Sequence, residues 1–224
     1  ASERVSVMKR NTKYEILQCA TKLFIEKGYT ATYVTSIANE LGISTGNLTF
    51  HFPTKEHILA ELINELLTLP RREEVKAVRG EHELLTGYLL ELAMFASVCR
   101  SNPNIKDLLV SAYTHPMSLE IIRESDTKRA MRIFGKYCPA WGETDFVQTA
   151  NVVSGMEYAM FMTENTDRLS FEQRVSSSLD AIMKVYEIPK DVRESIIAEI
   201  FASDYCGMGN HVFDEFCNYI AGKM

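Results

Sequence analysis

Polar side chains are concentrated in a short stretch near the N-terminus, "GISTGNLTFHFPTKEHIL" (residues 42–59). Its members Ser44, Thr45, Asn47, Thr49 and His51 can all donate or accept hydrogen bonds. Hydroxyl and amide groups of this kind suit base edges and phosphate oxygens. Gly46 would let the backbone approach such a partner closely. The stretch therefore favours a surface that recognises a polar partner such as DNA.

The residues around this stretch predict two short helices joined by a tight turn. We expect a helix at about 35–41, capped by Thr35 and ended by Gly42, and a second one that begins after Ser44. A short helix, a glycine-containing turn and a second helix make a helix–turn–helix. In that motif the second helix lies in the major groove of DNA, with its N-terminal residues at base edges.

The individual side chains fit DNA contacts. Asn47 suits adenine N6 and N7, and a threonine methyl suits the thymine methyl. Thr54 caps a further helix, whose N-terminus and Lys55 favour a phosphate. We expect Phe52 to be core, while Phe50 suits either the core or a thymine methyl. The predicted DNA contacts are Lys13, Thr35, Ser44, Thr45, Gly46, Asn47, Thr49, Phe50, His51 and Lys55.

Helical periodicity dominates the whole chain, so we expect an all-α fold. A capping box "TKYE" at Thr12 begins a helix over 12–27, which Gly28 ends. A further helix should follow Thr54. Beyond a charged connection near 70–80 we expect helices at about 82–100, 104–113, 118–137, 145–165, 170–186, 190–203 and 210–222.

Charge is distributed unevenly along the 224 residues. The net charge is -6 at pH 7. Residues 1–60 hold seven Lys and Arg against five Asp and Glu, whereas residues 61–224 hold seventeen against twenty-five. We therefore expect two domains with different partners: a DNA-binding domain over 1–60 and a larger helical regulatory domain over 61–224.

The cysteines and the hydropathy indicate a cytoplasmic protein. Five widely spaced cysteines without a CxxC pair favour reduced thiols over a disulfide scaffold or a zinc site. No uninterrupted apolar run reaches the ~18 residues of a membrane span, and we see no signal-peptide pattern. We expect no membrane association, no metal and no cofactor.

Residues 12–62 resemble the DNA-binding domain of TetR-family transcriptional regulators, over "ILQCATKLFIEKGYTATYVTSIANELGISTGNLTFHFPTKEHILAEL". The matching positions are Phe24, Gly28, Tyr29, Thr35, Ile37, Ala38, Gly42, Ser44, Gly46, Leu48, His51, Phe52, Lys55 and Leu59. The chain departs from the family pattern at Thr49, where a phosphate-contacting Tyr is usual; the family then has another aromatic or a basic residue, and here that position is Phe50. This departure puts the operator sequence in doubt more than DNA binding.

The resemblance implies a helical second domain that dimerises and encloses a small-molecule pocket. The apolar helix at 146–162 and the helix at 171–186 could form the dimer seam, and 190–203 is the alternative. For Glu157 the alternatives are contact with a cationic ligand, contact with an Arg across the dimer, a salt bridge, or exposure to solvent. The pocket candidates are Met94, Phe95, Cys99, Tyr113, Met117, Tyr137, Trp141, Met156 and Phe161.

These features predict a homodimeric, ligand-responsive regulator of transcription, a repressor that leaves a near-palindromic operator when it binds a small effector. One alternative is a helical dimeric binding protein without specific DNA readout. Another is a helical enzyme with Glu157 as its acid, but no HExxH, GxSxG or P-loop occurs. "GMGNHV" (207–212) lacks the third glycine of a dinucleotide-binding loop and reads as a turn.

Overall fold

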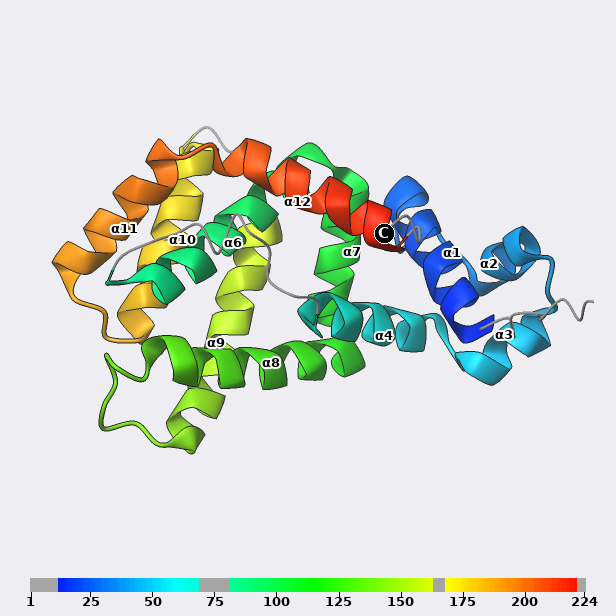
Figure 1. Ribbon diagram of the computed structural model, residues 1–224, viewed down its shortest axis with the longest axis horizontal. Helices are drawn as coiled ribbons and strands as arrows, with labels where there is room; N and C mark the ends of the chain where they lie inside the picture. Colours follow the sequence, from blue (N-terminus) through cyan, green and yellow to red (C-terminus); the bar gives the residue numbers. More distant parts are fainter. Residues whose placement is uncertain (1–11, 69–80, 163–167, 221–224) are drawn as a thin grey trace, which may run out of the picture.

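The computed structural model describes residues 12–68, 81–162 and 168–220, and in these ranges the chain forms eleven α-helices (Figure 1). The predicted all-α fold is confirmed. The helices are α1 (Thr12–Lys27), α2 (Val34–Leu41), α3 (Thr45–His51), α4 (Lys55–Thr68), α6 (Glu83–Ser101), α7 (Pro103–Thr114), α8 (Pro116–Phe134), α9 (Glu143–Met162), α10 (Phe171–Val185), α11 (Lys190–Ala202) and α12 (Tyr205–Ile220). The predicted connection at 70–80 lies outside the described residues.

Helices α1, α2 and α3 form a small unit at one end of the molecule (Figure 1). Its core is built from the apolar stripe of α1, with Ile16 and Phe24 fully buried, and from Ile37 of α2. Gly28 and Gly42 follow α1 and α2 with φ of 89° and 65°, the left-handed conformation that glycine adopts without a Cβ penalty. Both predicted helix ends are therefore confirmed.

Helix α4 leads from this unit into the rest of the molecule (Figure 1). Its buried residues Ile58, Leu59 and Leu62 complete the core of the three-helix unit. The same helix packs against α7 and α8. The proposed domain boundary at residue 60 falls inside α4, so this helix takes part in both units.

The second unit is arranged around α6, which is buried along most of its length. With 19 residues and a mean hydropathy of 1.2, α6 is long and apolar enough to cross a membrane. Its apolar residues form no uninterrupted run, because Glu83, Glu91 and Arg100 interrupt the segment. Helices α7, α8, α9, α10, α11 and α12 all pack against α6. Burial in a helical core explains its composition.

The final helix departs from the prediction, since α12 begins at Tyr205 and not near residue 210. Gly207 and Gly209 lie inside it, so the expected turn at "GMGNHV" is wrong. A Cβ on Gly209 would lie 2.9 Å from the carbonyl oxygen of Met94, so the glycine permits close contact between α12 and α6. The helix then runs back to α1, where Phe216 is buried in the core of the three-helix unit (Figure 1).

Candidate nucleic-acid interface

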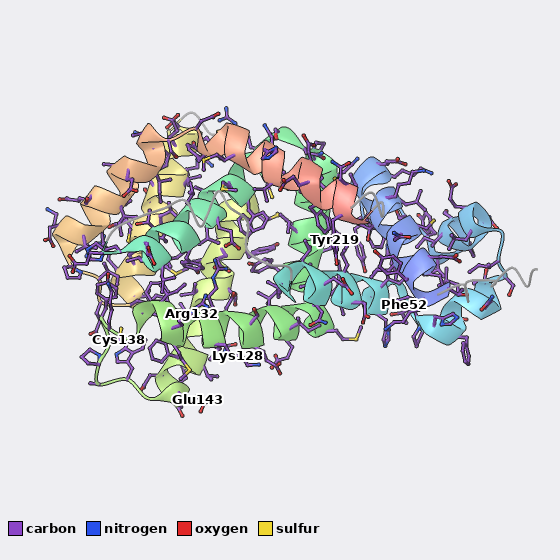
Figure 2. The ribbon with its side chains drawn as sticks, in the orientation of Figure 1. Phe52, Lys128, Arg132, Cys138, Glu143 and Tyr219 are labelled. Carbon is purple, nitrogen blue, oxygen red and sulfur yellow. The ribbon has the colours of Figure 1, made fainter. Side chains whose placement is uncertain are left out.

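The short helix α3 is fixed by its cap and by one apolar side chain. Ser44 is the N-cap, as predicted, and its hydroxyl accepts a hydrogen bond from the backbone N–H of Asn47 at 3.1 Å. Leu48 is fully buried in the core of the three-helix unit. Phe52 follows the helix and is buried too, as expected; its position near the three-helix end is visible in Figure 2. The rest of α3 faces outward.

The outward side of α3 carries most of the predicted base-reading residues. Thr45, Gly46 and Asn47 are exposed. A Cβ on Gly46 would meet only the Ser44 hydroxyl, at 3.9 Å, so the space beside this backbone is open. Phe50 is 83% exposed, which settles its position outside the core. An exposed surface of hydroxyl, amide and aromatic groups on a helix of this size matches what the major groove accepts.

Two further members of the set are held by neighbours on α3 itself. The Thr49 hydroxyl donates to the carbonyl oxygen of Gly46 at 3.2 Å. His51 is half-buried, with its ring edge-on to that of Phe50 and 5.3 Å between the centroids. Thr49 therefore presents its methyl group to a partner more readily than its hydroxyl. The His51 ring packs against the exposed ring of Phe50.

Thr35 and Lys13 occupy places that differ from the simplest expectation. Thr35 is exposed, but the N-cap of α2 is Tyr33, whose side chain forms no capping hydrogen bond, so the predicted Thr35 cap is wrong. Lys13 is exposed, and its ammonium lies 2.8 Å from the carboxylate of Glu61 on α4. A surface ion pair of this kind contributes only about 0–1 kcal/mol, so it does not prevent Lys13 from reaching a phosphate.

Lys55 has an intramolecular role that the sequence did not indicate. Its ammonium donates to the carbonyl oxygens of Tyr29 at 2.8 Å and Thr32 at 2.9 Å. It also lies 4.2 Å from the centroid of the Tyr29 ring, a cation–π contact. Burial lowers the pKa of the lysine. Lys55 ties α4 to the loop between α1 and α2, so the N-terminal N–H groups of α4 are a better candidate for phosphate contact than its ammonium.

Substitution of Lys55 by Met separates these two roles. Met keeps the length of the apolar stem but removes both hydrogen bonds and the cation–π contact, so we expect a loss of about 2 kcal/mol in the free energy of unfolding. Urea denaturation checks this result, with Lys22→Met on the exposed side of α1 as the control. An unchanged free energy of unfolding together with weaker DNA binding would instead assign Lys55 to phosphate.

The three-helix unit, called the head below, also forms hydrogen bonds with α7 of the second unit. The residues of α7 that make them, Asn104 and Asp107, were not among the predicted site residues. Asp107 accepts hydrogen bonds from the backbone N–H of Thr30 at 2.7 Å and from its hydroxyl at 2.6 Å. The Asn104 amide donates to the carbonyl oxygens of Ile25 at 3.1 Å and Glu26 at 2.9 Å. These carbonyl groups belong to the last turn of α1, where intrahelical hydrogen-bond donors are missing. No sequence signal could have paired residues almost eighty positions apart.

Three of the predicted pocket residues come together in the second unit. The Phe161 ring lies edge-on to the ring of Tyr113, with 5.7 Å between centroids, and to that of Phe95, at 6.4 Å. These residues come from α9, α7 and α6. Next to them, the Glu157 carboxylate accepts hydrogen bonds from the hydroxyls of Tyr88 at 2.6 Å and Tyr113 at 2.8 Å.

The other pocket candidates are distributed over separate parts of the structure. Tyr137 forms a hydrogen bond with His82 at 2.5 Å, and Trp141 packs against Phe146 and Tyr186. Both lie near the end of α8, where Figure 2 places Cys138, far from the three-helix unit. The structure therefore does not gather all nine candidates around one point. Met94 and Cys99 are buried, Met156 is partly buried, and Met117 is exposed, so Met117 does not line the core.

Glu157 is only 1% exposed, so an exposed Glu at this position is excluded. Burial raises the pKa of its carboxyl above the ordinary value of 4.5, although the two tyrosine hydroxyls and the charge of Arg129 act in the opposite direction. The folded state therefore binds more protons than the unfolded chain in the pH range just above 4.5.

The consequence is a stability difference that depends on pH. As pH rises through this window, the unfolded carboxyl ionises first, so the free energy of unfolding should fall until the folded carboxyl also ionises. Gln does not titrate, and Glu157→Gln should lack this slope. Urea denaturation of both proteins between about pH 4 and 8 checks it. A constant difference between the two curves would show that burial does not perturb Glu157.

Within the described ranges, no three His, Cys, Asp or Glu side chains are grouped closely enough to hold a metal ion. The three buried cysteines are free thiols, and burial raises the pKa of Cys99 to about 12 and that of Cys138 to about 11. Thiols of such high pKa are poor nucleophiles.

A capped, glycine-linked pair of short helices with an exposed polar second helix defines a helix–turn–helix DNA-binding protein. Residues 16–62 match the family model described as "Bacterial regulatory proteins, tetR family". Over these residues the chain matches the DNA-binding domain of this family of transcriptional regulators.

Individual relatives agree with this assignment. The chain is 44% identical to the HTH-type transcriptional regulator QacR of Staphylococcus aureus over 54 residues, which is 24% of this chain and 29% of QacR. It is 37% identical to the repressor KstR2 of Mycobacterium tuberculosis over 65 residues, 29% of this chain and 32% of KstR2. The chain thus aligns with about a third or less of each of these two relatives.

Longer alignments are weaker in sequence. HbdR of Aromatoleum is 26% identical over 144 residues, which cover 62% of this chain and 61% of HbdR. The crystal structure of TylP, a TetR regulator from Streptomyces fradiae, superposes with a TM-score of 0.50 at 18% identity, covering 92% of this chain and 99% of TylP. The structural likeness concerns the fold.

Proposed function

We propose that this chain is a homodimeric repressor that reads a near-palindromic DNA operator and releases it when a small molecule binds to the second unit. The observation that carries the proposal is α3, whose exposed polar side is held in place by the Ser44 cap and by buried Leu48. Relatives named as repressors, KstR2 among them, support the direction of regulation. The protein would act in the cytoplasm and without enzymatic turnover.

The DNA contacts would be divided between bases and phosphates. Asn47 and the methyl group of Thr45 would meet base edges, and exposed Phe50 would meet a thymine methyl. Lys13, Thr35 and the N-terminus of α4 would hold the phosphates on either side. Two such heads in one dimer would occupy successive major grooves about 34 Å apart or somewhat more, which requires a near-palindrome.

A second copy of the chain would pack against the outer side of α9. Val147, Val152 and Met162 are exposed apolar residues on this helix, with Val152 58% exposed. Between them, a Cβ on exposed Gly155 would find no atom within 4 Å, so another helix could approach closely. Helix α10 would complete the seam, and α11 remains the alternative.

Effector binding would act on the heads through α4 and α7, because both helices contact the three-helix unit and the second unit. An effector shifts the heads only if it binds the released arrangement more tightly than the DNA-bound one. A change in the angle of α4 would alter the distance between the two reading helices.

The proposal is tested by incubating the purified protein with sheared DNA from its source organism at near-physiological salt and sequencing the fragments that it retains. Recovery of a shared near-palindrome supports it, particularly if Asn47→Ala abolishes the enrichment. Retention of random fragments, lost as salt rises, would contradict specific readout and favour a helical binding protein held to DNA by counterion release alone.

A further inference from the structure

The carboxylate of Glu157 lies in the core of the second unit, and among the described residues its hydrogen-bond donors are two neutral hydroxyls. One of its oxygens accepts from Tyr88 and the other from Tyr113. These residues come from α9, α6 and α7, so three helices converge on one buried acidic group. Such a group loses its hydration on folding and recovers only part of that energy from two hydroxyls.

Further aromatic rings pack against the two tyrosines that bind this carboxylate. Tyr113 contacts Phe161, and Phe161 contacts Phe95. On the other side, the Tyr88 ring lies edge-on to Phe134, with 5.7 Å between centroids. The negative faces of aromatic rings attract cations, and an ionised carboxylate beside them adds a full charge.

The positive charge that acts on Glu157 is already engaged by another carboxylate. The cation that acts on Glu157 is Arg129, whose guanidinium already forms a two-point ion pair with Glu91, one contact being 3.2 Å long. Arg129 also lies 4.6 Å from the centroid of the Tyr88 ring. A structural ion pair would have supplied Glu157 with its own cation.

We propose that Glu157, Tyr88 and Tyr113 form the polar end of the effector site, and that the site takes an organic cation, a protonated amine on an apolar body. The proposal deepens the ligand response proposed above and rests on it for its biological meaning. The ammonium would bind the Glu157 carboxylate in place of a tyrosine hydroxyl, and the apolar body would lie among Phe95 and Phe161.

The position of Tyr113 connects this site to the DNA-binding head. Tyr113 lies on α7, near the end opposite to Asn104 and Asp107, which hold the end of α1 and Thr30. An ammonium that displaces the Tyr113 hydroxyl from Glu157 removes one of the contacts that fix α7 against α9. Because α7 is a single helix of 12 residues, its displacement would reach the head directly.

The test uses 4-phenylbutylamine, which is protonated at pH 7 like a lysine side chain, and the neutral alcohol 4-phenylbutanol, which has the same size. Calorimetric titration of the full-length protein without DNA should show saturable binding of the amine, at least about tenfold tighter than of the alcohol. Glu157→Gln should bind both with equal affinity. Glu124→Gln, at an exposed acid on α8, should keep the preference for the amine.

Equal affinity of the wild-type protein for amine and alcohol, or no saturable binding of the amine, would overturn the cation site. Preservation of the preference in Glu157→Gln would overturn it as well. If Glu157→Gln does not fold, Tyr113→Phe decides the question, since it leaves the carboxylate and should retain or strengthen the preference. Retention of operator DNA in the presence of the amine is measured separately. Binding of the amine without release of DNA would support the proposed cation site but contradict the proposed function as a ligand-responsive repressor.

Discussion

Replacement of Asn47 by Ala should abolish the enrichment of a specific operator while the protein stays folded. The Asn47 side chain is exposed on α3, and only its backbone N–H takes part in the Ser44 cap, so the substitution leaves the cap intact. A bidentate amide–adenine contact contributes about 1–3 kcal/mol of discrimination, which corresponds to roughly 5- to 150-fold in affinity per head. Both heads of a dimer lose it together.

The measurement is a titration of the recovered operator and of a scrambled fragment of the same length, at fixed salt. Affinity for the operator should fall toward that for the scrambled fragment, while affinity for the scrambled fragment stays the same. Asn210→Ala, at an exposed Asn on α12, is the matched control and should change neither. An equal loss for both fragments would assign Asn47 to phosphate contact.

Replacement of Leu48 by Ala should be the most damaging change in the three-helix unit. Leu48 is the one buried residue of α3, a helix that is described over its full length of seven residues. Removing a buried Leu side chain typically costs about 2–5 kcal/mol, because apolar contacts are lost and a cavity remains. Since no other side chain of α3 is buried, the helix should also detach locally and lose operator binding.

Urea denaturation would measure the global loss, and hydrogen exchange at residues 45–51 would measure the local one. Leu67→Ala on α4, where the side chain is 38% exposed, is the control and should cost far less. Rapid exchange in α3 with a nearly unchanged free energy of unfolding would show that this helix is already independent of the core. Slow exchange in α3 of the variant would contradict the anchoring role of Leu48.

The helices and the helix–turn–helix were predictable because their signals are local. The apolar repeat of α1, the glycines at 28 and 42 and the cap at Ser44 act within one or two turns of the chain, so their meaning does not depend on distant residues. For the same reason the exposed side of α3 was predictable: a short helix can bury Leu48 on one side only.

Other features were decided by residues far apart in sequence. Lys55 carries a charge suited to phosphate, but the carbonyl groups of the loop between α1 and α2 lie within its reach. The sequence is compatible with a ligand, an Arg across the dimer, a salt bridge or solvent at Glu157, and only the fold places two tyrosine hydroxyls on it. The glycines of "GMGNHV" are turn-formers by propensity, yet close packing on α6 keeps them helical. Propensity is a difference of about 1 kcal/mol per residue, and tertiary contacts of several residues outweigh it.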